Sequence, residues 1–116
     1  MASQSYCGQI VWAEMADANG IRKERPVVII TPDDQIGEAG LVEVVAITSK
    51  VPNPLPEDHV LLPWHAQGHP RTGLNRKCAA VCSWMGQIAI EDIQSVAGMT
   101  PAKILAEIAS KLPGIN

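Results

Sequence analysis

The positively charged side chains of this chain gather in two short segments, although the chain as a whole is acidic. It contains 9 Lys and Arg against 12 Asp and Glu, which gives a formal net charge of −3. Six of these nine cations belong to the two segments: Arg22, Lys23, Arg25, Arg71, Arg76 and Lys77. His65 and His69 precede the second group, and residues 64–77 include no acid. Such clusters can bind phosphate groups, and a solvated loop face is the alternative.

Arg25 occupies a position that suits phosphate chemistry. It precedes Pro26, and the residue before a proline is held in an extended conformation. The segment 26–31 is a short apolar run rich in β-branched residues, so Arg25 stands where the chain enters a buried strand. A guanidinium in this place could clamp a phosphate with two parallel hydrogen bonds. Pairing with a nearby carboxylate is the alternative.

Two hydroxyl residues, Thr48 and Ser49, close a second aliphatic run at 41–48. Hydroxyls at the point where a strand enters a loop can donate hydrogen bonds to an oxyanion or a phosphate oxygen. Ordinary capping of the loop backbone is the alternative for both residues.

The histidines and cysteines do not predict a metal or another cofactor. Cys78 and Cys82 would lie on one face of a strand but roughly 13 Å apart, too far to share a metal ion. His65 and His69 have the spacing of metal ligands on a helix, but the Gly and Pro residues beside them make a helix improbable. We expect the three cysteines to be small, buried, apolar side chains.

Three tryptophans supply most of the aromatic surface, because the chain has no Phe. Trp12, Trp64 and Trp84 could stack on nucleic-acid bases. They could equally anchor an aliphatic core. We expect Trp64, which lies between Pro63 and His65, to be the exposed ring.

Short apolar segments separated by turn residues must position these side chains. The sequence predicts strands at 9–15, 26–31, 41–48, 59–62, 78–85 and 87–90, the last two separated at Gly86. The polar segment 16–25, with its Asn-Gly turn signal, is expected to be a loop. We expect Thr100 to cap a final helix that has Pro101 at its first position, and a short helical turn near 91–95.

These elements predict a mainly β fold, with a small barrel-like sheet and one C-terminal α-helix packed on it. The length of 116 residues fits a single domain over 1–116. No apolar run approaches the ~20 residues of a membrane helix, and the N-terminus does not resemble a signal peptide. Three cysteines without a disulfide-type spacing are typical of a reducing cytoplasm.

Taken together, the segments resemble the MazF/PemK family of bacterial toxins over about residues 8–112. The resemblance is carried by GQIVW at 8–12, RPVVIIT at 25–31, VVAITS at 44–49, HVLL at 59–62 and TGL at 72–74. It implies a small SH3-like barrel of the CcdB/PemK type that forms homodimers. It also implies a sequence-selective endoribonuclease, an mRNA interferase, that cleaves single-stranded RNA without a metal or cofactor. The ribose 2′-hydroxyl attacks the adjacent phosphate and leaves a 2′,3′-cyclic phosphate and a 5′-hydroxyl.

The resemblance also implies roles for individual residues. In the family, the Arg before Pro and the Thr of the Thr-Ser step serve the scissile phosphate, which assigns catalysis to Arg25 and Thr48. We expect the remaining candidates to bind substrate: Arg22, Lys23, Ser49, His65, His69, Arg71, Arg76 and Lys77. The implied partners are single-stranded RNA and a cognate antitoxin whose disordered segment covers the RNA site.

Two segments depart from the family pattern. A Gly-x-Glu-Gln stretch is replaced by the shorter, basic 20–24, and an Asp-Gln-Ile-Arg stretch in the fifth strand is replaced by 82–85, which has no acid. Proton transfer would then fall to Arg25 alone or to a histidine such as His65 or His69. The alternative function is a non-catalytic binding protein or a gyrase-targeting, CcdB-like toxin on the same fold. The C-terminal residues 111–116 lack the Trp-Gly-Ile-type ending expected of the latter, which favours the ribonuclease.

Overall fold

The computed structural model describes residues 6–36 and 40–113. Within these residues the chain forms, in order, β1 (Gln9–Ala16), β2 (Arg22–Ile29), β3 (Leu41–Thr48), β4 (His59–Leu61), β5 (Ala79–Ala89), β6 (Ser95–Met99) and α1 (Ala102–Ser110). Two 3₁₀ turns, η1 (Asp33–Gln35) and η2 (Ile90–Asp92), connect some of them. Of the helices in the described part, none is long and apolar enough to cross a membrane.

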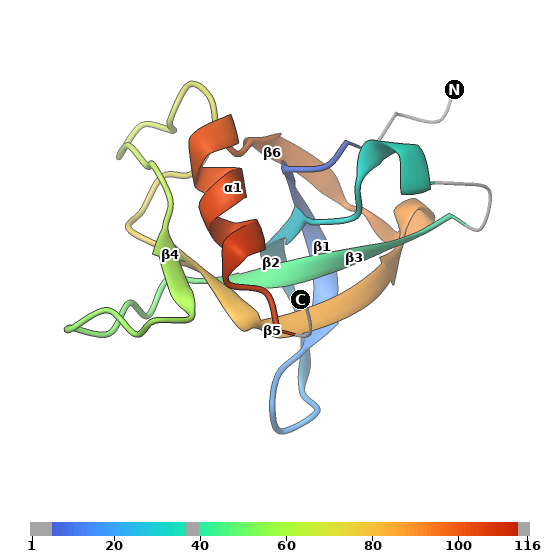
Figure 1. Cartoon of the computed structure of the whole chain (residues 1–116), viewed down its shortest axis with the longest axis horizontal. Coiled ribbons are helices and arrows are strands. Elements are labelled where there is room, and N and C mark those ends of the chain that lie inside the picture. Colours follow the sequence, from blue (N-terminus) through green and yellow to red (C-terminus); the bar gives the residue numbers. More distant parts are fainter. Residues whose placement is uncertain (1–5, 37–39, 114–116) are drawn as a thin grey trace.

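The strands pair into one antiparallel sheet of six strands with the order β4-β5-β3-β2-β1-β6. Figure 1 shows that the sheet is strongly curved, that α1 packs across one face, and that the β1–β2 hairpin extends beyond the other strands. The expected mainly β fold with a terminal helix is therefore confirmed.

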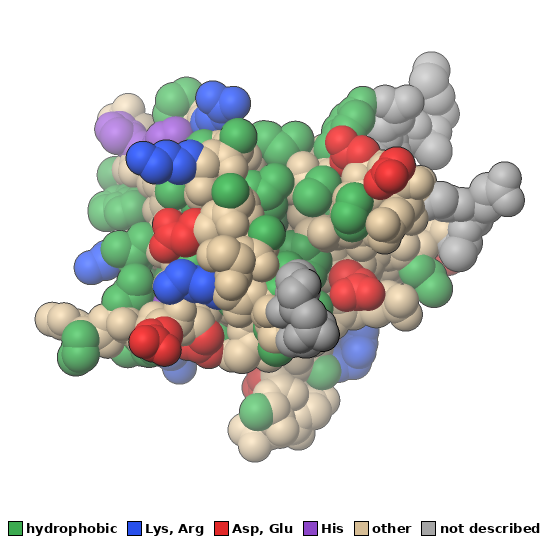
Figure 2. Space-filling view, viewed as in Figure 1, with side chains coloured by type: hydrophobic (Ala, Val, Ile, Leu, Met, Phe, Trp, Pro, Cys, Tyr) green, Lys and Arg blue, Asp and Glu red, His purple; other side chains and the backbone are tan. Residues whose placement is uncertain are grey.

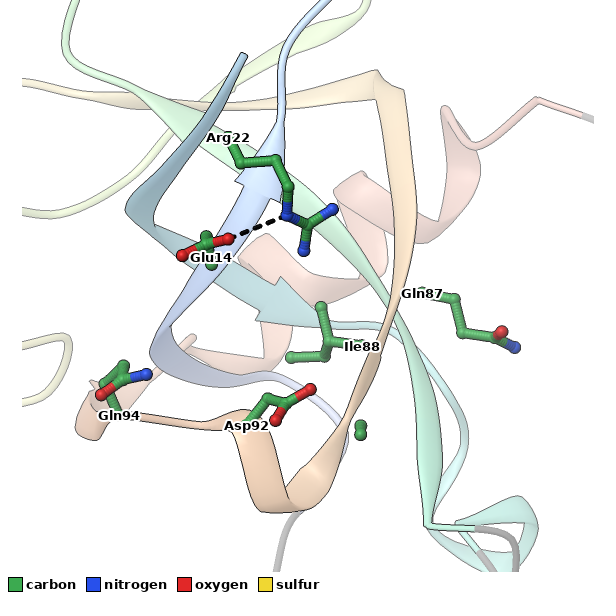
Figure 3. A pocket seen from close by; sticks show the side chains of 7 residues that line it. Glu14, Arg22, Gln87, Ile88, Asp92 and Gln94 are labelled. Carbon is green, nitrogen blue, oxygen red and sulfur yellow. Dashed lines mark hydrogen bonds and ion pairs between the residues drawn. The ribbon is translucent and has the colours of Figure 1, made fainter. Parts of the chain in front are cut away.

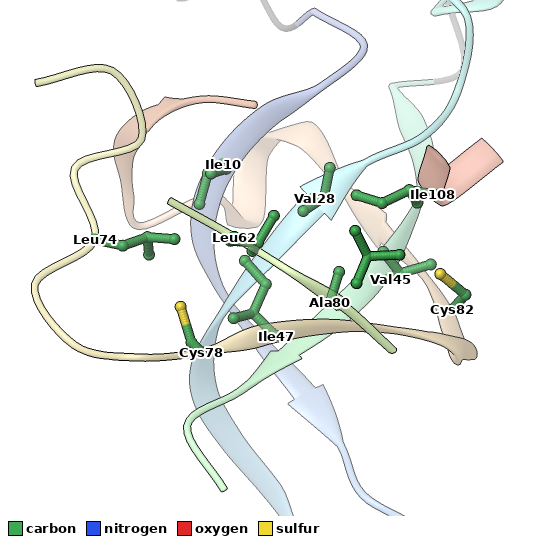
Figure 4. Packing of buried hydrophobic residues seen from close by; sticks show 11 residues of the cluster. Ile10, Val28, Val45, Ile47, Leu62, Leu74, Cys78, Ala80, Cys82 and Ile108 are labelled. Carbon is green, nitrogen blue, oxygen red and sulfur yellow. The ribbon is translucent and has the colours of Figure 1, made fainter. Parts of the chain in front are cut away.

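Apolar side chains cover both faces of the sheet, which explains why its central strands are continuous apolar runs. The neighbours Val27 and Val28 of β2 belong to different core clusters, as do Val44 and Val45 of β3. The cluster in Figure 4 lies on the face covered by α1 and includes Ile108, the fully buried residue of the helix. Both faces of the two central strands are therefore buried under apolar side chains.

The hairpin differs from the expected loop because β2 starts at Arg22 rather than at Pro26. Ala13 pairs with Arg25 and Ala16 pairs with Arg22, so the basic segment belongs to the strand. The turn itself is at 17–21, where Asp17 Oδ1 accepts hydrogen bonds from the backbone N–H groups of Asn19 (2.9 Å) and Ile21 (3.0 Å).

The last strands also differ from the prediction. β5 continues through Gly86, which pairs with Val44, so the two expected strands are one. A Cβ at Gly86 would lie 2.7 Å from Met15 Cε, the flexible end of the side chain that packs over the strand here. The short helical turn expected near 91–95 is the 3₁₀ turn at Ile90–Asp92, and β6 follows it unpredicted.

Thr100 does not cap the helix, so that prediction is wrong. The helix starts at Ala102 with Pro101 at the N-cap position, and no side chain bonds to its first turn. Thr100 is instead buried between β6 and α1, where its backbone N–H donates to Gly8 O at 2.8 Å. The hydrogen bond from Thr100 N–H to Gly8 O ties this segment to the start of β1, and this tertiary contact outweighs the local preference of Thr for a helix cap.

Candidate active site

A cleft of about 770 Å³ lies where the β1–β2 hairpin, the end of β3 and the segment before β5 meet. Its polar lining residues include Lys23, Arg25, Thr48, Ser49, Asn75 and Arg76. Its apolar lining residues include Trp12, Pro26, Ile47, Leu74, Cys78 and Trp84. The fold therefore brings together Arg25 and Thr48, which are separated in sequence, in one concave surface.

The Arg25 guanidinium lies over the ring of Trp84, with Cζ 4.7 Å from the ring centroid. Such a cation–π contact contributes about 0.5–2 kcal/mol, depending on desolvation. Among the described residues, Nε is buried without a hydrogen-bond partner, and Arg25 makes no ion pair. The expected alternative, a carboxylate partner, is not found in the described part of the chain.

Thr48 is the last residue of β3, Ser49 follows it, and both line the cleft that Arg25 also lines. Thr48 Oγ1 accepts a hydrogen bond from the backbone N–H of Lys50 at 3.1 Å, which is the capping role weighed for it. The hydroxyl proton of Thr48 is not used in this bond, so it can still be donated to an anion in the cleft. Lys50 also lines the cleft.

The remaining basic candidates are divided between the cleft and other surfaces. Lys23 and Arg76 line the cleft, whereas Arg71, Lys77 and the two histidines do not. Arg22 lines a separate pocket of about 260 Å³, where its Nε donates to Glu14 Oε1 at 2.8 Å (Figure 3). An exposed pair of this kind contributes about 0–1 kcal/mol. Its main consequence is that the charge of Arg22 is directed away from the cleft.

The histidines shape the loop between β4 and β5 through backbone contacts. His69 Nδ1 accepts hydrogen bonds from the N–H groups of Arg71 (3.1 Å) and Thr72 (3.3 Å), and His65 Nδ1 accepts one from Gln67 (3.1 Å). Both Nδ1 atoms are therefore unprotonated in this arrangement. In Figure 2, histidines lie beside Lys and Arg side chains at the corner of the molecule formed by this loop.

Thr72 fixes the end of this loop through hydrogen bonds of its side chain, and the residues that follow it line the cleft. Its buried hydroxyl donates to Pro63 O at 2.8 Å and accepts from the N–H of Leu74 at 3.2 Å. Leu74, Asn75 and Arg76 then line the cleft. The histidine and threonine contacts thus position Arg76 indirectly.

Several lining residues were not singled out in the sequence: Glu24, Lys50 and Asn75. Glu24 has an exposed carboxylate with no bonded partner among the described residues, whereas Asp17, the other acid of the cleft, is bonded in the turn. Glu24 is thus an unbonded acid among the cleft residues, but it pairs with Glu14 across the hairpin, so its side chain starts from the face of β2 opposite to Arg25. The position of Glu24 directly before Arg25 in the sequence could have identified it as a candidate.

Cys78 lines the cleft but is not a nucleophile. Burial raises the pKa of its thiol to about 11, although the charge of Arg76 acts in the opposite direction. It is therefore protonated at neutral pH. No group of three or more potential metal ligands occurs within residues 6–36 and 40–113.

Comparisons with known proteins agree on one family. The family model of the PemK-like, MazF-like toxins of type II toxin–antitoxin systems matches residues 6–115. No curated protein sequence matches the chain. Similar solved structures include MazF of Deinococcus radiodurans in form I, with 21% identity and a TM-score of 0.73 over 93% of this chain and 92% of that chain.

Two further structures support the same fold. MazF-mt6 of Mycobacterium tuberculosis is 22% identical with a TM-score of 0.69, over 90% of this chain and 91% of that chain. An endoribonuclease from a mycobacterial species is 12% identical with a TM-score of 0.70, over 99% of each chain. At these identities the likeness shows the architecture.

Proposed function

Because the chain belongs to the family of PemK-like, MazF-like toxins of type II toxin–antitoxin systems, we propose that it is an endoribonuclease toxin acting on single-stranded RNA. The observation that carries the proposal is the Arg25 guanidinium, held in a cleft beside Thr48 without an anionic partner in the described residues. A phosphodiester supplies the missing anion. Cleavage is sequence-selective and requires no metal.

In this mechanism the nucleophile belongs to the substrate. The ribose 2′-hydroxyl attacks the adjacent phosphorus, and negative charge accumulates on the non-bridging oxygens. The bond between phosphorus and the 5′-oxygen breaks, and the 5′-oxygen takes a proton from the solvent to become the 5′-hydroxyl. Arg25 stabilises that charge through donors that face the cleft, and Thr48 donates its hydroxyl to the same group. Because both groups are placed before substrate arrives, their stabilisation is greatest in the transition state.

The proton of the 2′-hydroxyl needs an acceptor. We propose Glu24 for this role, since it is a residue of the cleft and its carboxylate is not bonded within the described chain. The histidines are less suitable because each Nδ1 already accepts loop N–H groups. Lys23, Lys50 and Arg76 bind flanking phosphates, as expected of cations along a single-strand path.

Partners follow from the same family membership. Similar structures include MazE–MazF complexes of Deinococcus radiodurans. We propose that a cognate antitoxin covers the cleft of this chain with a disordered acidic segment, and that the toxin acts in the cytoplasm as a homodimer. The alternative of a gyrase-directed toxin depended on the C-terminal ending, and residues 114–116 lie outside the described part.

The test is cleavage of a mixed-sequence RNA in the presence of EDTA. We expect fragments that carry 2′,3′-cyclic phosphate and 5′-hydroxyl ends, with cuts at a recurring short sequence. Substituting 2′-deoxyribose at the mapped site should block that cut. If varied RNAs stay intact at high enzyme concentration, a non-catalytic binding protein replaces the proposal.

A further inference from the structure

The strand β5 contains a bulge opposite the centre of β3. Val45 pairs with Met85, but the next residue, Ala46, pairs with Val81. Cys82, Ser83 and Trp84 therefore have no partner in this register. Bulges of this kind change the direction of side chains, often beside functional sites.

The bulge reverses the face on which Trp84 lies. Residues two apart in a regular strand share a face. Here Cys82 belongs to the core cluster under α1, while Trp84 packs against the cluster on the opposite face. Arg25 is two residues before Val27, a member of that second cluster, so the bulge brings the Trp84 ring to the face that carries Arg25.

Asp58, just before β4, holds the bulge in place. Its backbone oxygen accepts from the N–H of Cys82 at 2.7 Å, and its carboxylate accepts from the Ser83 hydroxyl. His59 Nδ1 lies 2.7 Å from the other carboxylate oxygen. Both residues lower the pKa of Asp58, the Ser83 hydrogen bond most, so this acceptor is ionised at neutral pH.

The Trp84 ring is fixed at a second point as well. Its Nε1–H donates to Ala16 O at 3.0 Å, at the end of β1. The ring is therefore held between the bulge and the hairpin, with Arg25 over its face. An aromatic face attracts a guanidinium without using its N–H donors. A carboxylate in this place would neutralise the cation and occupy its fork.

We propose that Trp84, set by the Asp58-anchored bulge, is the positioning residue that holds the Arg25 guanidinium ready for the scissile phosphate. The proposal rests on the ribonuclease function above. The ring comes from the fifth strand, where the family pattern has an acid, and it orients Arg25 while leaving the charge of Arg25 available to substrate.

The variants are Trp84→Phe, which keeps an aromatic face, and Trp84→Leu, which removes it. Trp64→Leu is the matched control, since Trp64 is 45% exposed and does not line the cleft. Single-turnover rates at saturating RNA report the chemical step. The dissociation constant of RNA with 2′-deoxyribose at the cut site reports binding.

We expect Trp84→Leu to slow the chemical step about 100-fold, the loss typical of a group misplaced by about 1 Å. Trp84→Phe should stay within about 5-fold of the parent, and the affinity of the deoxy-substituted RNA should change by less than about 5-fold in both. Parental cleavage by Trp84→Leu would overturn the proposal. So would an equal loss of rate and affinity, because Trp84 would then bind the RNA itself.

A second readout separates this proposal from the function on which it rests. In protein with ¹⁵N-labelled arginine, the buried Nε–H of Arg25 should exchange slowly and show an aromatic ring-current shift. Trp84→Leu should abolish both features, and Trp84→Phe should keep them. If the parent cleaves no RNA, the proposed function fails, and this signal alone decides whether Trp84 positions Arg25.

If Trp84→Leu does not fold, Ser83→Ala replaces it. Ser83 is exposed and contributes to the bulge through its bond to Asp58, so its loss should not unfold the core. Faster Nε–H exchange in Ser83→Ala, with unchanged exchange in Trp64→Leu, supports the proposal. Unchanged exchange in both variants contradicts it.

Discussion

Arg25 and Arg22 are three residues apart on β2, yet the fold gives their guanidinium groups different roles. Arg22 is paired with Glu14, whereas Arg25 lies on an aromatic ring with no carboxylate bonded to it in the described chain. The difference follows from the alternation of side chains along a strand, which directs odd and even positions to opposite faces.

This contrast gives a matched pair of Arg→Lys variants. Arg25→Lys should lower the single-turnover cleavage rate by at least about 100-fold, because an ammonium cannot reproduce the planar fork of a guanidinium. Arg22→Lys, which keeps a charge beside Glu14, should cleave like the parent. Equal rates for the two variants would remove Arg25 from the chemistry, and thermal melting would confirm that both are folded.

Arg76 and Arg71 allow a test of binding rather than chemistry. Only Arg76 of these two lines the cleft, although both belong to one basic segment. Arg76→Ala should weaken RNA binding and lower the slope of log K against log salt by about 0.7, the contribution of one phosphate contact to a single strand. Arg71→Ala should leave the slope unchanged. A salt titration of a non-cleavable RNA measures both, and a parental slope for Arg76→Ala would contradict the assignment.

At the scale of elements, the loop before β5 contacts β6 closely at two glycines, one in the loop and one in the strand. A Cβ on Gly73 would lie 2.1 Å from Ala97 O, and one on Gly98 would lie 2.2 Å from Arg71 O. The N–H of Met99 donates to Arg71 O at 2.8 Å in the same contact. The atoms that a new Cβ would meet at these two glycines belong to the backbone, so no flexible side chain could move to make room for it.

Gly73→Ala is therefore expected to lower the free energy of unfolding by more than about 1 kcal/mol and to weaken RNA binding, since Leu74 and Arg76 would move. Gly68→Ala is the control. Both glycines have positive φ, +73° and +94°, but a Cβ on Gly68 would meet nothing within 4 Å. Urea unfolding measures the difference, and equal losses would show that backbone conformation, rather than the contact with Ala97, sets the cost.

Local sequence signals predict most of the elements but few of their relations. The β-branched runs of β1 and β3 and the apolar stripe of α1 were sufficient, because each depends on nearby residues. The bulge at 82–84 was not predictable in this way, since it depends on pairing with β3 and on bonds to Asp58.

The same limit applies to the candidate site. Thr48 ends β3, and Arg25 lies within β2 directly before the apolar run that the sequence marks, so both could be named in advance. Trp84 could be named as a ring, but its position under Arg25 results from contacts between distant segments. The prediction that Thr100 caps the helix was wrong for a related reason, because the contact of Thr100 with the start of β1 outweighed the preference of Thr for a helix cap.

For the whole molecule, burial of thiols predicts how stability depends on alkaline pH. Burial raises the pKa of Cys78 from 9.0 to about 11, so the thiol binds its proton more tightly when folded. Its contribution is complete below pH 9 and is lost as pH rises towards 11, up to about 2 kcal/mol. Cys78→Ala should reduce the loss of unfolding free energy between pH 8 and 10.5. Parallel pH profiles for parent and variant in urea unfolding would contradict this.

The assembly of the whole protein is a further prediction. A chain of 116 residues with exposed apolar side chains such as Leu61 and Val96 can bury them across a two-fold interface. We expect sedimentation equilibrium at micromolar concentration to give the mass of two chains. The mass of one chain would leave the homodimer unsupported.

The two-sided core has a consequence for how the protein fails when it is heated. β2, which contains Arg25, and β3, which ends at Thr48, both contribute residues to the two core clusters, so neither face can melt while the other survives. Catalytic inactivation and loss of the fold should therefore occur at one temperature. The slowest-exchanging amides should be those of these two strands, which would make hydrogen exchange at their centres a direct measure of how long the active form persists.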